Sequence, residues 1–89
     1  KRHVASFFEL TPEEVEACMA LITGEKKLID ETFNPDGYNI GVNVGQAAGQ
    51  SIFHVHIHII PRYAGDVENP QGGVRHVIPN KGHYTRQTV

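Results

Sequence analysis

An alternation of nine residues, from Ile52 to Ile60, constrains the fold of this chain more than any other feature. Successive side chains of a β-strand point to opposite faces of a sheet, so strict alternation predicts a strand. One face of this strand would carry His54, His56 and His58, spaced by about 6.5 to 7 Å. The other face is the predicted core face, formed by Phe53, Val55, Ile57 and Ile59.

A long helix is predicted ahead of this strand. Thr11 and Glu14 can form a capping box, and Pro12 suits the first helical position. Gly24 is expected to dent or break the helix, because glycine is a poor helix former. An apolar stripe at helical spacing, with charged residues opposite it, consists of Val15, Cys18, Met19, Ile22, Leu28 and Ile29.

Three further segments are defined by their turn residues. Positions 34–37 combine asparagine, proline, aspartate and glycine, which supply a turn before a second predicted strand from Tyr38 to Val44. Residues 45–51 form a small, polar loop between the two strands. Beyond Pro61, we expect residues 74–78 to form an edge strand or an extended arm.

The composition argues against several classes of function. Eight Lys and Arg residues against ten Asp and Glu give a net charge of −2 without a long basic stretch, so we expect no polynucleotide ligand. No apolar run approaches the roughly 18 residues of a membrane span, and the single Cys18 favours a reducing compartment. We therefore expect a soluble, cytoplasmic protein of one domain, whose small size favours a homodimer.

Three histidines in alternation indicate chemistry, and two types of site fit them. Histidines two apart on a strand can ligate zinc, but the further ligands would have to come from His3, His76, His83, Cys18 and the carboxylates. No pair among these shows metal-ligand spacing. The second possibility is nucleophilic phosphate chemistry, because a neutral imidazole attacks phosphorus and neighbouring imidazoliums can stabilise the charge that develops.

The loop before the histidines suits a phosphate. Gly45 and Gly49 would let the backbone approach an anion closely, while Gln50 and Ser51 offer an amide and a hydroxyl. The loop lacks the lysine of a P-loop, so by itself it is weak evidence for a phosphate site, and it supports such a site only together with the histidines.

The run from Gly49 to Arg62 resembles the signature of the histidine triad (HIT) family, His-x-His-x-His followed by apolar residues. The resemblance extends to Lys1-Arg2-His3, which is similar to the family's Pro-Lys-x-His segment, and to Tyr38, Asn39 and Asn43. It covers the chain through Asp66. Residues 67–89 then form a variable C-terminal tail, and the family's usual N-terminal strands have no counterpart before Lys1.

The resemblance implies an α+β fold, in which one long helix packs across an antiparallel sheet. It also implies a nucleotide hydrolase in which His56 attacks the α-phosphorus and forms a nucleotidyl-histidine intermediate. The implied catalytic partners are His54, His58 and Ser51, and the implied phosphate or nucleotide ligands are Asn43, Gly49, Gln50 and His3. The hydrolase branch is favoured because His58 stands where nucleotidylyltransferase-like relatives carry glutamine.

The implied substrate is a dinucleoside polyphosphate or a nucleoside phosphoramidate, with adenine favoured as the base. The reaction requires no cofactor, although a structural zinc can accompany the family's N-terminal strands in the full-length protein. A noncatalytic nucleotide-binding or interaction module and a zinc-binding domain are the alternatives.

Overall fold

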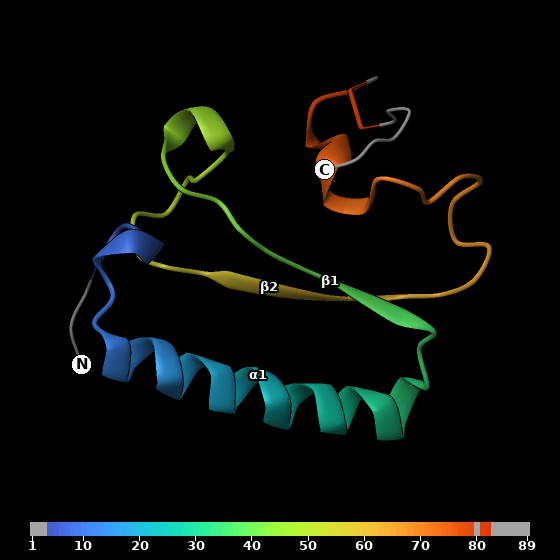
Figure 1. Cartoon of the computed structure of the whole chain (residues 1–89), viewed down its shortest axis with the longest axis horizontal. Coiled ribbons are helices and arrows are strands. Elements are labelled where there is room, and N and C mark those ends of the chain that lie inside the picture. Colours follow the sequence, from blue (N-terminus) through green and yellow to red (C-terminus); the bar gives the residue numbers. More distant parts are fainter. Residues whose placement is uncertain (1–3, 80, 83–89) are drawn as a thin grey trace.

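The computed structural model describes residues 4–79 and 81–82. One long helix runs alongside a two-stranded sheet, and short 3-10 helices lie before the long helix, between the two strands and after the second strand (Figure 1). The α+β fold with an antiparallel sheet is confirmed. The elements in chain order are η1 (Phe7–Glu9), α1 (Pro12–Phe33), β1 (Gly37–Val42), η2 (Gln46–Ala48), β2 (Ile57–Arg62) and η3 (Gly73–Val77).

Local signals set both ends of α1. The Thr11 hydroxyl accepts the Glu14 amide at 3.1 Å, and the Glu14 carboxylate accepts the Thr11 amide at 2.8 Å, as the capping box predicts. Asn34 ends the helix in the left-handed region, at φ 50°. The helix continues through Gly24, so the expected break was wrong: one glycine costs only about 1 kcal/mol, and its neighbours favour helix.

The sheet pairs β1 with β2 in antiparallel register, from Gly37 opposite Arg62 to Val42 opposite Ile57. The predicted strand at Tyr38 is confirmed, although it ends at Val42. The histidine strand begins at Ile57 rather than Ile52, which corrects the sequence prediction. Because β1 stops at Val42, residues 52–56 have no partner in it and form a bend at 52–54 followed by two residues without regular secondary structure.

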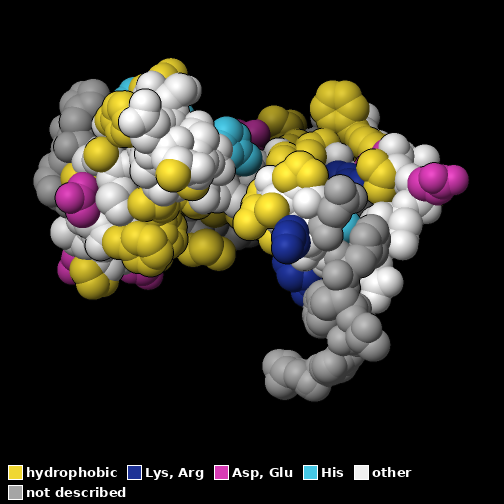
Figure 2. All heavy atoms as spheres, turned by 90° about the horizontal axis from the view of Figure 1, so that it is seen from above, with side chains coloured by type: hydrophobic (Ala, Val, Ile, Leu, Met, Phe, Trp, Pro, Cys, Tyr) yellow, Lys and Arg dark blue, Asp and Glu magenta, His cyan; other side chains and the backbone are white. Residues whose placement is uncertain are grey.

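The apolar faces of α1 and β2 meet across a groove of about 690 Å³. Val55, Ile57 and Ile59 line it, as predicted for the core face, but Phe53, which lies in the bend before β2, is 58% exposed and does not line the groove. No hydrophobic side chain within residues 4–79 and 81–82 is fully buried. Hydrophobic side chains accordingly gather on the surface shown in Figure 2.

Tyr38 joins the sheet to the helix. Its hydroxyl donates to Asp30 at 2.6 Å, and Lys26 contacts the other oxygen of that carboxylate at 2.7 Å. Desolvation, together with the hydrogen bond to Asp30, raises the pKa of Tyr38 to about 12. The hydrogen bonds from Lys26 and then Tyr38 hold the pKa of Asp30 below its usual value.

A second ion pair, between Arg62 and Asp66, stabilises the turn after β2. Arg62 contacts both carboxylate oxygens of Asp66, at 2.7 and 2.9 Å, and also donates to the side chain of Asn39. The hydrogen bond from Arg62, followed by that from the Tyr63 amide, holds the pKa of Asp66 far below its usual range. The same pairing raises the pKa of Arg62.

The segment expected as an edge strand or extended arm at 74–78 is mostly helical, so that prediction was wrong. Gly72 and Gly73 adopt φ values of 98° and 52°, which turn the backbone into η3. The Arg75 amide then donates to the Gly72 carbonyl at 3.0 Å. In the described part of the chain, no helix combines the length and apolarity needed to cross a membrane.

Candidate functional site

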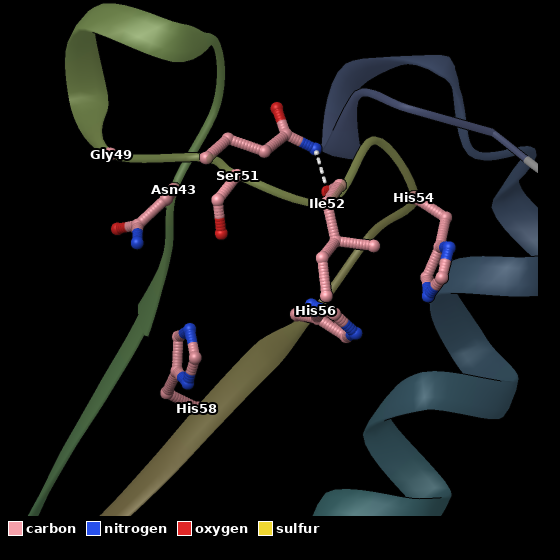
Figure 3. A pocket seen from close by; sticks show the side chains of 8 residues that line it. Asn43, Gly49, Ser51, Ile52, His54, His56 and His58 are labelled. Carbon is pink, nitrogen blue, oxygen red and sulfur yellow. Dashed lines mark hydrogen bonds between the residues drawn. The ribbon is translucent and has the colours of Figure 1, made fainter.

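A pocket of about 180 Å³ lies where β1 ends and β2 begins (Figure 3). It brings together every predicted site residue except His3, which lies outside the described residues. Its lining consists of Asn43, Gly49, Gln50, Ser51, Ile52, His54, His56 and His58.

The three histidines do not form an even row. The ring centroids of His56 and His58 are 6.5 Å apart, as the strand spacing predicts, but those of His54 and His56 are 4.7 Å apart. The difference arises because His54 and His56 precede the first residue of β2. His54 lies toward α1 and lines the apolar groove as well as the pocket (Figure 3).

The loop before the histidines is shaped by two glycines with positive φ angles. Gly45 has φ 89° and Gly49 has φ 94°, values that side-chain-bearing residues rarely adopt. The Gly49 amide donates to the Gln46 carbonyl at 2.9 Å, and the Gln50 amide donates to the Gly45 carbonyl at 3.1 Å. The turn places Gly49 near Asn43, on the opposite wall of the pocket (Figure 3).

Gln50 differs from the other lining residues because it is buried, at 8% exposure. Its Oε1 accepts the Gly45 amide at 2.8 Å. Its Nε2 donates to the Ala5 carbonyl at 2.7 Å and to the Ile52 carbonyl at 3.2 Å, the latter drawn in Figure 3. The predicted contact between Gln50 and phosphate stays a prediction.

The remaining polar groups of the pocket suit an anion. Imidazole rings, the Asn43 amide and the Ser51 hydroxyl can all donate hydrogen bonds. Among the residues that the structure describes, the lining includes no aspartate or glutamate that would repel a phosphate. The arrangement therefore combines a candidate nucleophile with neutral or positively charged donors.

A family model of the HIT domain matches residues 1–65. This chain belongs to the HIT family. An uncharacterised HIT-like protein of Methanocaldococcus jannaschii is 44% identical over 70 residues, which cover 76% of this chain and 52% of that protein. A bis(5'-adenosyl)-triphosphatase of Dictyostelium discoideum is 41% identical over 69 residues, which cover 78% of this chain and 46% of that protein.

Solved HIT structures share the fold. A HIT family protein from Bacillus anthracis superposes with a TM-score of 0.68 at 32% identity, covering 100% of this chain and 53% of that one. The chain thus spans about half the length of the HIT proteins compared with it here.

Zinc occurs in another HIT relative. A Zn-bound histidine triad protein from Mycobacterium smegmatis matches with a TM-score of 0.64 at 36% identity, covering 74% of this chain and 48% of that one. Within residues 4–79 and 81–82, no three His, Cys, Asp or Glu side chains are grouped to hold a metal. A structural zinc in the full-length protein stays a prediction.

Three residues that contribute to this site, Ile52, Val4 and Ala5, were not among the predicted site residues. Ile52 lines the pocket beside the histidines, as its place in the alternation from Ile52 to Ile60 implies, but it was not among the predicted site residues. The backbone of Val4 and Ala5 also supports the site through their carbonyls. No sequence signal marks such carbonyls, because any residue provides one.

Proposed function

We propose that this chain forms the catalytic part of a HIT nucleotide hydrolase. The observation that carries the proposal is the position of His56, whose ring lies 4.7 Å from that of His54 and 6.5 Å from that of His58 in a pocket also lined by Asn43 and Ser51. A nucleophile flanked by hydrogen-bond donors suits attack on a phosphorus atom.

In the proposed first step, a ring nitrogen of His56 bonds to the α-phosphorus while the bond to the leaving group breaks. The leaving group departs with the bonding electron pair and takes up a proton. Water then attacks the same phosphorus, the P–N bond breaks, and a nucleoside monophosphate leaves while His56 is regenerated.

The surrounding residues take separate roles in this proposal. His54 and His58 stabilise charge on the phosphoryl oxygens, and Ser51 donates to an oxygen or assists the leaving group. Asn43 binds the phosphate from the opposite wall, and Gly49, which has no side chain, leaves room for the phosphate to approach. His3 is proposed to contribute near the site, although it lies outside the described residues.

The proposed substrate is a dinucleoside polyphosphate or a nucleoside phosphoramidate, with adenine as the favoured base. The name of one relative, a bis(5'-adenosyl)-triphosphatase, supports a dinucleoside polyphosphate, and the name of another, an adenylylsulfatase of Arabidopsis thaliana, supports adenine as the base. A homodimer and a cytoplasmic location stay predictions.

Intact-mass spectrometry tests the mechanism. The protein reacts briefly with adenosine phosphoramidate, the reaction is stopped without acid, and the mass of the protein is measured. We expect an adduct of one adenylyl group, and we expect His56→Ala to abolish it and to lower turnover by about 10³-fold or more. His76→Ala is a matched control because His76 lies in η3, outside the pocket, and it should stay within about twofold of the unsubstituted chain.

Two results would count against the proposal. Unchanged turnover in a folded His56→Ala variant would remove His56 as the nucleophile. AMP binding with neither adduct nor product would instead indicate a noncatalytic nucleotide-binding module.

A further inference from the structure

We propose that Gln50 is a positioning residue, which clamps the loop 45–50 to the backbone of Ala5 and thereby fixes Ser51 in the pocket. The consequence for catalysis rests on the proposed function, whereas the clamp itself does not. This role differs from the phosphate contact that the family resemblance implies.

The hydrogen-bonding capacity of the side chain argues for this role. A glutamine amide has two N–H donors, and those of Gln50 are taken by the carbonyls of Ala5 and Ile52, at 2.7 and 3.2 Å. The orientation of the amide follows from its partners: a backbone N–H at Gly45 requires the oxygen, and two carbonyls require the nitrogen. No N–H of Gln50 is left for a phosphate oxygen.

The burial of Gln50 also argues for a positioning role. Gln50 is 8% exposed, whereas Asn43, Ser51, His56 and His58 are exposed. A group that binds substrate must be reachable from the pocket, while a buried amide with satisfied partners fixes the backbone around it.

The segment Val4–Ala5 binds the stretch from Gln50 to Val55 at both of its ends. The Ala5 carbonyl accepts the Gln50 side chain, and the Val4 carbonyl accepts the Val55 amide at 2.9 Å. These two bonds bracket Ser51 and His54, which lie outside the strand β2. Neighbouring carbonyls therefore replace the missing strand partner of residues 50–55.

Amide hydrogen exchange on the intact chain tests the clamp without any substrate. In Gln50→Ala, we expect the amides of Gly45 and Val55 to exchange about tenfold faster or more, while those of α1 keep their rates. Gln46→Ala is the matched control, since Gln46 is an exposed residue of the same loop. Unchanged exchange at Gly45 and Val55 in Gln50→Ala would overturn the proposal.

Kinetics then separate positioning from phosphate binding. Gln50→Glu keeps an acceptor for Gly45 but sets a carboxylate oxygen against the carbonyls of Ala5 and Ile52. We expect both Gln50→Ala and Gln50→Glu to slow formation of the adenylyl adduct by about 10- to 100-fold, while the Kd for AMP changes less than about threefold.

A direct phosphate ligand would give the opposite pattern, with weaker AMP binding, most of all in Gln50→Glu, and that result would refute the positioning role. If the unsubstituted chain forms no adduct, the proposed function fails, and the exchange rates still decide whether Gln50 clamps the loop.

Discussion

The two ends of the β1–β2 sheet are stabilised by different kinds of interaction. At the end near Gly37 and Arg62, charged side chains pair with each other: Lys26 with Asp30, and Arg62 with Asp66. At the other end, the described residues that line the pocket include no Asp, Glu, Lys or Arg, and an uncharged amide, Gln50, holds the loop.

The difference shows how a small domain can place the ion pairs that stabilise its fold away from the pocket that binds its substrate. Ion pairs next to the pocket would compete with an incoming phosphate for its donors, because a carboxylate and a phosphate bind the same N–H and O–H groups. Backbone-directed bonds from Gln50 fix the loop without adding charge. The pocket end of the sheet is therefore suited to bind an anion, while the charged side chains at the end near Gly37 and Arg62 link the helix to the sheet.

The largest effect on adduct formation is expected from distorting the backbone at the pocket end of the sheet. Gly49 has φ 94°, and a side chain there would be strained and would approach the Asn43 amide. We expect Gly49→Val to slow adduct formation by about 100-fold and to lower the free energy of unfolding by about 1–2 kcal/mol. Stopped-flow mass analysis and urea unfolding measure the two effects; an adduct rate within twofold would show that the turn does not position the site.

A smaller effect, on stability alone, is expected at the charged end. The pKa of Tyr38 is about 12 in the folded protein and 10.0 for an ordinary tyrosine, so folding favours the protonated phenol. This contribution is fully present below pH 10 and is lost as the pH rises toward 12. Tyr38→Phe should lower the Tm at neutral pH, remove this alkaline loss and leave the adduct rate unchanged.

Thermal unfolding followed across the alkaline range checks this prediction, with Tyr63→Phe as the matched control that keeps the alkaline loss. Equal alkaline sensitivity in Tyr38→Phe and the unsubstituted chain would contradict it. A change in adduct rate would show that the two ends of the sheet are coupled.

The smallest effect is expected away from both ends, in the middle of α1. Gly24 is helical, and an added Cβ would meet no atom within 4 Å. Gly24→Ala should therefore raise the free energy of unfolding by about 0.5–1 kcal/mol and leave catalysis unchanged. Urea denaturation measures the gain, and a lower free energy of unfolding in Gly24→Ala would contradict the prediction.

The sequence by itself determined the features whose causes lie within a few residues of each other. The Thr11 and Glu14 capping box set the start of α1, the turn at 34–37 set the start of β1, and the alternation marked the histidines. The last three residues of the loop 45–51, Gly49 to Ser51, line one pocket together with the three histidines, and the chemical roles of these residues stay predictions. These signals are local, so no tertiary contact was needed to read them.

Only the tertiary structure decided where β2 begins, how His54 is turned and what Gln50 contacts. Alternation shows which residues could form a strand, but a strand also needs a partner, and β1 ends before it can pair with residues 52–56. The partner of that stretch, Val4–Ala5, is about 45 residues away in sequence, as the Gln50 to Ala5 bond shows. A hydrogen bond to a backbone carbonyl leaves no trace in side-chain patterns, because every residue has that carbonyl.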